Sequence, residues 1–96
     1  MVAMVAVKEH IMKITTESGT VYNINRNIAT IEGNNLFAVK MWNNFCFDVE
    51  AVGDMTLSEL LSNKELHLPL QIGKRMVVNG RDEWRISTPI VSIEED

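Results

Sequence analysis

The sequence contains little of what metal binding, cofactor binding or disulfide bonding requires. Its 96 residues include one cysteine, two histidines and five glycines. Because Cys46 has no second cysteine to pair with, an internal disulfide is excluded, and a reducing compartment suits the chain. His10 and His67 lie far from each other, without the spacing of a zinc site. No glycine-rich phosphate loop is present. We therefore expect neither a metal nor a cofactor.

Catalytic motifs, positive charge and long apolar runs are also scarce. No serine lies in a GxSxG motif, and the carboxylates of Asp48 and Glu50 are expected to face solvent, with Lys40 as the partner of Asp48. The net charge of −4 disfavours non-specific binding to nucleic acid. No apolar run reaches the roughly 18 residues of a membrane span, and the apolar start has no basic residue before it. The sequence predicts a non-enzymatic, cytoplasmic protein that is not associated with a membrane.

What the sequence does contain is a series of short strands. Residues 12–96 are predicted to form one small β domain, preceded by an extension at residues 1–11. In residues 12–25, a three-residue loop ending at Gly19 would pair Ile14 with Tyr22 and Met12 with Ile24. Gly19 then occupies the position where a G1 bulge needs a left-handed residue. This hairpin is supported by both turn chemistry and apolar pairing.

The middle of the chain predicts a third strand at residues 28–32 and then a second hairpin. Residues 36–42 and 45–52 would fold about Asn43 and Asn44, which pairs the apolar positions with one another. In this register Trp42 lies on the polar face and Phe45 lies at the loop tip. The alternative register places both rings in the core.

A short helix and two further strands are expected after this hairpin. Thr56 and Glu59 match a capping box, which predicts a helix of at most two turns. Residues 65–72 alternate as a strand, and Pro69 restricts that strand to a sheet edge. In residues 70–95, a loop centred on Arg81 would pair Val78 with Trp84, and a bulge is expected next to Pro89.

These elements predict a mainly β fold, a small, partly open barrel of the SH3-like or OB-like kind. It would have about six or seven short strands and one short helix. The open strand edge at residues 65–72 and the apolar extension at residues 1–11 both favour a homodimer.

Two surfaces are candidate binding sites. The first is the predicted hairpin tip, which would bind a protein partner through exposed aromatic anchors and comprises Trp42, Asn43, Asn44 and Phe45. The second would bind a nucleotide or single-stranded nucleic acid by stacking and phosphate contacts and comprises Arg75, Arg81, Trp84 and Arg85. An alternative interpretation of the second set places Trp84 in the core and pairs Arg85 with a surface acid.

The two ends of the predicted domain resemble short proteins of actinobacterial phages and prophages. The resemblance lies in residues 14–25 (ITTESGTVYNIN) and 85–96 (RISTPIVSIEED), which hold a Thr-Ser-Gly-type hairpin and a closing strand with Pro89. It covers about a quarter of the chain and involves strand and turn residues only. It implies an accessory phage protein that binds a host or phage protein, and it implies no active site.

Overall fold

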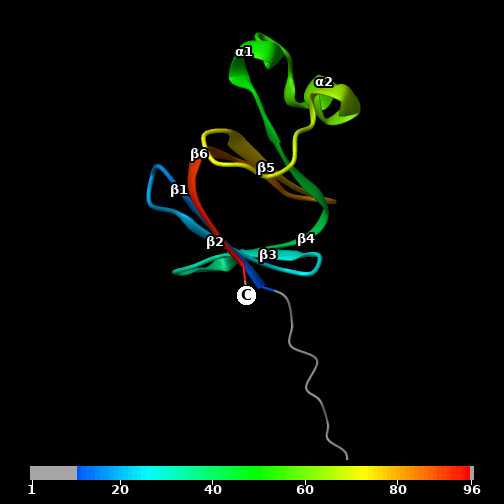
Figure 1. Cartoon of the computed structure of the whole chain (residues 1–96). Helices are drawn as coiled ribbons and strands as arrows, with labels where there is room; N and C mark the ends of the chain where they lie inside the picture. Colours follow the sequence, from blue (N-terminus) through cyan, green and yellow to red (C-terminus); the bar gives the residue numbers. More distant parts are fainter. Residues whose placement is uncertain (1–10, 96) are drawn as a thin grey trace, which may run out of the picture.

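The computed structural model describes residues 11–95, which form a closed antiparallel barrel in which each strand pairs with its neighbours in sequence order (Figure 1). A small barrel with a short helical segment is thus confirmed. The strands are β1 (Ile11–Thr16), β2 (Val21–Asn25), β3 (Ile28–Ile31), β4 (Asn34–Phe47), β5 (Arg75–Gly80) and β6 (Trp84–Glu95). Between β4 and β5 lie α1 (Val49–Val52), α2 (Leu57–Ser62) and the 3-10 helix η1 (Lys64–Leu66).

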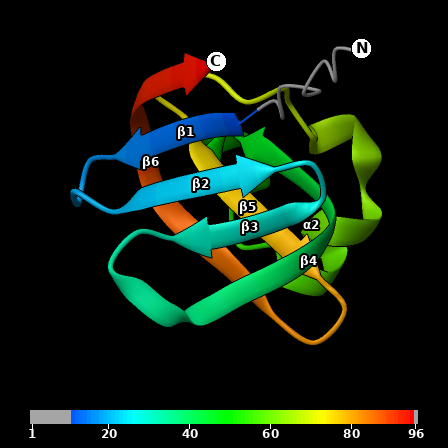
Figure 2. The same cartoon turned by 90° about the horizontal axis from the view of Figure 1, so that it is seen from below.

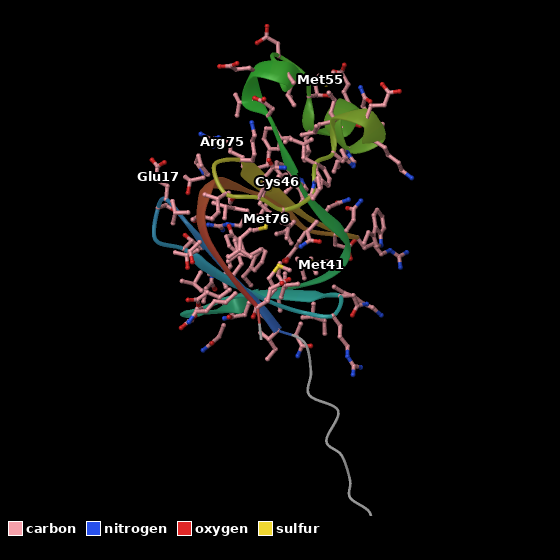
Figure 3. All side chains as sticks on the ribbon, viewed as in Figure 1. Glu17, Met41, Cys46, Met55, Arg75 and Met76 are labelled. Carbon is pink, nitrogen blue, oxygen red and sulfur yellow. The ribbon has the colours of Figure 1, made fainter. Side chains whose placement is uncertain are left out.

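The interior of the barrel is the main core. Side chains from every strand meet there, and Figure 3 shows Met41, Cys46 and Met76 among them. Figure 2 looks onto β1 to β4, with β5 and β6 crossing behind them, and Figure 1 shows the helices outside the ring of strands. Except for Ile11 in β1, the predicted extension lies outside the described residues.

The first hairpin confirms its predicted register. β1 and β2 pair Met12 with Ile24 and Ile14 with Tyr22, and the amide of Thr16 donates to the Thr20 carbonyl at 3.0 Å. Gly19 has φ +89°, as the predicted turn requires. Local turn chemistry and one buried face are sufficient to determine this element.

The predicted hairpin about Asn43 and Asn44 is wrong. β4 runs without a turn from Asn34 to Phe47, pairing with β3 through its first half and with β5 through its second half. A bulge at Trp42 marks the change between the two sheets. Asp48 pairs with Lys74, Nζ to Oδ2 at 3.2 Å, and not with Lys40.

The last three residues of β4 are buried although their side chains alternate between the two faces, which the predicted pattern did not allow for. Cys46 points into the barrel, while Phe45 and Phe47 pack outside it with Val77 and with Leu60 of α2. The ring of His67 stacks on Phe45 at 3.6 Å between centroids. Phe45 is therefore a core residue, 5% exposed, and the prediction of a loop-tip position was wrong.

The helical segment folds from local signals. The Thr56 hydroxyl accepts from the Glu59 amide, and the Glu59 carboxylate accepts from the Thr56 amide, so the predicted capping box is confirmed. The predicted strand at residues 65–72 is wrong. Its beginning lies in η1, and only Leu68 forms a bridge, to Cys46. The barrel closes without this stretch, so it supplies no open edge for dimerisation.

The last hairpin is shifted by one residue from its predicted register. Asn79 pairs with Trp84 and Val77 with Ile86, and the Gly80 amide donates to the Glu83 carbonyl across a two-residue loop. β6 then shifts register on both sides of Pro89. At the first shift, the Met76 amide donates to the buried Ser87 hydroxyl at 3.0 Å, which satisfies the group that the bulge leaves without a ladder partner.

Candidate interaction surface beside the helices

The helices cover only part of the outer face of the sheet formed by β4, β5 and β6. Phe45 and Val77, which are neighbours across β4 and β5, lie under this cover. Two residues further along, Asn43, Asn79 and Trp84 form the next rung of the same face. Because side chains alternate along a strand, this rung points outward like the covered one. The outer face thus continues beyond the helices without cover.

We call this uncovered surface the Trp face. Its members are exposed or partly exposed residues of three adjacent strands, namely Trp42, Asn43, Asn79, Trp84 and Ile86. Trp42 is included because it occupies the β4 bulge directly before Asn43.

The Trp face combines large apolar side chains with a fixed polar pair. Trp42 is 70% exposed, Trp84 is 54% exposed and Ile86 is 37% exposed. Between the two tryptophans, the Asn79 side-chain amide donates to the Asn43 carbonyl oxygen at 3.3 Å. Clustered exposed aromatics of this kind are enriched at protein interfaces and scarce elsewhere on a protein surface.

The structure divides the first predicted site. Trp42 is exposed as expected, and Asn43 belongs to the Trp face. Asn44 pairs with Val78, a barrel-core residue, and therefore points to the inner side of the sheet. Phe45 is buried beneath His67. Asn79 was not predicted to lie here because the register, wrong by one residue, paired Trp84 with Val78. Ile86 was not predicted because that register buried the face it shares with Trp84.

The second predicted site is not assembled. Trp84 belongs to the Trp face, whereas Arg75 lies at the far end of β5, paired with Phe47 and Pro89 (Figure 3). Arg81 lies in the turn after β5. Arg85 is on the inner side of β6, opposite Val78. The four residues therefore do not form one strip.

Arg85 instead contacts side chains of β2 and β4. Its Nε donates to the hydroxyl of the buried Tyr22 at 2.9 Å, and its guanidinium lies 5.8 Å from the centre of the Phe37 ring. These contacts satisfy a buried hydroxyl and form a cation–π pair. Arg85 makes no salt bridge with another described residue, so the pairing with a surface acid that the alternative interpretation predicts is absent there.

Two titratable groups have pKa values that the structure displaces. Burial raises the pKa of the Cys46 thiol, an effect partly offset by its contact with the Gln71 carbonyl at 3.9 Å. The Lys74 ammonium and the Glu50 amide hold the pKa of the Asp48 carboxyl below its usual value. Cys46 is fully buried and in its thiol form, which makes it a poor nucleophile.

Within residues 11–95, no group of three or more His, Cys, Asp or Glu side chains is arranged to hold a metal ion. The helices of the same residues are all too short to cross a membrane. No protein-family model, curated protein or solved structure matches this chain. The resemblance to phage proteins thus remains a prediction.

Proposed function

We propose that this protein is a non-enzymatic binding module that engages another protein through the Trp face. The observation that carries the proposal is the uncovered half of an otherwise buried sheet face, where Trp42, Trp84 and Ile86 are exposed together. The helices of the same chain bury the rest of this face.

The composition of the Trp face indicates the kind of partner. Its five residues carry no charge, and its two tryptophans supply most of the area that contact would remove from water. The Asn43–Asn79 pair offers hydrogen-bonding groups at the centre of the surface. A partner with an apolar patch and few charges is therefore favoured over one bound by electrostatic attraction.

The biological setting of this proposal comes from the sequence. The resemblance of residues 14–25 and 85–96 to phage and prophage proteins favours a host or phage protein as the partner. The single cysteine, which is buried and reduced, favours the cytoplasm as the place of action.

A capture experiment with matched variants tests the proposal. Wild-type protein is compared with Trp42→Ala/Trp84→Ala, and a control removes two exposed apolar side chains elsewhere, Ile72→Ala/Val91→Ala. We expect the same partner to be captured by the wild type and the control and lost, by at least about tenfold, from the tryptophan variant. Equal capture by all three proteins would contradict the proposal.

A second copy of the chain is the simplest such partner, and we propose a homodimer as one form of this interaction. A two-fold contact would cover both Trp faces, and two-fold symmetry is the commonest in homo-oligomers. Light scattering at micromolar concentration should then give a dimer mass for the wild type and a monomer mass for Trp42→Ala/Trp84→Ala. A monomer mass for the wild type would contradict the homodimer and leave the binding of a different protein to the capture experiment.

Single-stranded nucleic acid is the alternative ligand, because it too stacks on exposed tryptophans. The separation of Arg75, Arg81 and Arg85 argues against it, since Arg75 lies at the far end of β5 and Arg85 on the inner side of β6. Quenching of tryptophan fluorescence by an oligonucleotide at low salt, weakened by added salt, would support this alternative. Fluorescence that does not respond would exclude it.

A further inference from the structure

The barrel has a small cavity at the end where β1 begins and β2 ends. The cavity is about 250 Å³ and is lined by Met12, Ile24, Arg26, Asn44 and Leu70. These residues come from β1, β2, the β2–β3 turn, β4 and the segment before β5. We call this cavity the barrel mouth. It lies on the inner side of the sheet, whereas the Trp face lies on the outer side.

The lining of the barrel mouth is apolar on one side. Ile24 is a member of the main core, and Met12 and Leu70 pack against that core while remaining partly exposed. A ligand that contacts these three side chains would cover apolar surface that the barrel leaves open to water.

Two hydrogen-bond donors face the same cavity. Asn44 lies on the inner side of β4, between neighbours that are mostly apolar, and its carboxamide makes no hydrogen bond with another described residue. Arg26 is an exposed residue at the edge of the cavity, and its guanidinium forms no salt bridge with any described residue. Both groups can donate, and Arg26 carries a full positive charge.

The backbone conformation of Arg26 is itself strained. It is the first residue of the two-residue turn between Asn25 and Ile28, and its φ is +57°, in the left-handed region. Glycine is the usual residue at the first position of such a turn, because a side chain there is strained. Residues in strained backbone conformations cluster at functional sites, and Arg26 stands at the edge of a partly apolar cavity.

We infer that the barrel mouth binds a small carboxylate with a short apolar chain. The carboxylate oxygens would accept hydrogen bonds from Arg26 and Asn44, and the chain would lie against Met12, Ile24 and Leu70. A carboxylate accepts only, which matches two donors, and one unit of negative charge matches one arginine. Glu95 is the cross-strand neighbour of Met12 and is not among the residues that line the cavity.

Hexanoate is the probe for this site, used with the full chain. Methyl resonances of Met12, Ile24 and Leu70 are followed during the titration, and those of Met55 and Leu36 serve as distant controls. We expect saturable shifts at the three lining residues only, with a dissociation constant of about 1 mM, as befits a ligand of this size. Hexylamine and hexanol, which have the same chain without the carboxylate, should bind at least about tenfold more weakly.

Two variants identify the polar groups. Arg26→Gly removes the cation while keeping the turn, and we expect hexanoate affinity to fall by at least about tenfold. Asn44→Ala should lower the affinity less, by about fivefold, because it removes one neutral hydrogen bond. The inference is overturned if the wild type shows no saturable shifts up to about 20 mM, or if Arg26→Gly binds hexanoate as well as the wild type does.

Discussion

At the residue scale, the backbone of Arg26 lies in a region that is strained for a residue with a side chain. Its φ of +57° is the only positive value outside glycine in residues 11–95. Replacing it with glycine removes the steric cost and adds some conformational entropy to the unfolded chain, so we expect Arg26→Gly to stabilise the protein by about 0.5–1 kcal/mol. Urea denaturation measures this change. A destabilised Arg26→Gly variant would mean that the arginine side chain contributes more to folding than its strain costs.

Asp48 links the start of α1 to Lys74, the residue before β5, and this link depends on pH. Its folded-state pKa lies below the usual value because Lys74 and the Glu50 amide favour the carboxylate. The resulting stability is therefore present above the ordinary carboxyl pKa, near pH 4, and is lost as the pH falls through the lower folded-state pKa.

We expect the urea midpoint of the wild type to fall more steeply below about pH 4 than that of Asp48→Asn. Asparagine is a suitable comparison because it also caps helix N-termini, so α1 keeps its first hydrogen bond. Parallel pH profiles for the two proteins would show that Asp48 contributes nothing through its charge.

At the element scale, the approach of β5 to β4 requires a glycine. A Cβ placed on Gly80 would lie 2.6 Å from Val39 Cγ1 and 2.8 Å from the Lys40 carbonyl oxygen. The Lys40 carbonyl oxygen belongs to the backbone and cannot move without shifting β4, so Gly80→Ala should destabilise the protein by about 1–3 kcal/mol. Thermal or urea unfolding measures the loss, with Asn79→Ala on the same strand as control. Equal stability of the two variants would contradict the close contact.

The continuous path of β4 from Asn34 to Phe47 leads to a second prediction at this scale. Phe45 is buried beneath His67 and Trp42 is exposed, so Phe45→Ala should cost about 3–5 kcal/mol, whereas Trp42→Ala should cost less than about 1 kcal/mol. A hairpin with its tip at Asn43 and Asn44 would give similar, small losses at both positions. The two unfolding free energies therefore distinguish a continuous strand from a hairpin.

How much of each element could be predicted depended on how many of its faces are buried. The first hairpin has a defined turn at Gly19 and one buried face, and its register followed from the sequence. β5 is buried on both faces, with Val77 under the helices and Val78 inside the barrel, so both of its registers look apolar. Choosing one buried face for such a strand gave a register wrong by one residue.

Tertiary packing explains why part of the candidate site was not predicted. Exposure of Trp42 followed from its place in the alternating pattern. That Trp42 and Trp84 lie on one surface could not be predicted from the sequence. It depends on the path of β4 from one sheet to the other and on how much of the outer face the helices cover. Both are tertiary features, and Asn-Asn in β4 is overridden as a turn signal by pairing with β5.

At the scale of the whole molecule, the chain is a closed barrel with a helical segment on one outer face. The helices and the barrel share β4 and β5, so the outer sheet face is half core and half surface. The barrel mouth and the Trp face lie on opposite sides of this sheet. We therefore expect hexanoate to leave protein binding at the Trp face unchanged.

The central claim, that the Trp face is where a protein partner binds, is tested most directly by site-specific photo-crosslinking. A photoreactive residue is placed at position 42 or 84 and, as controls, at exposed position 72 or 91 of the full chain. Crosslinking is then carried out in lysate of the cell in which the protein acts. We predict that positions 42 and 84 crosslink to one common protein and that positions 72 and 91 do not. Crosslinks to that protein only from positions 72 and 91, or no common product from positions 42 and 84, would contradict the claim.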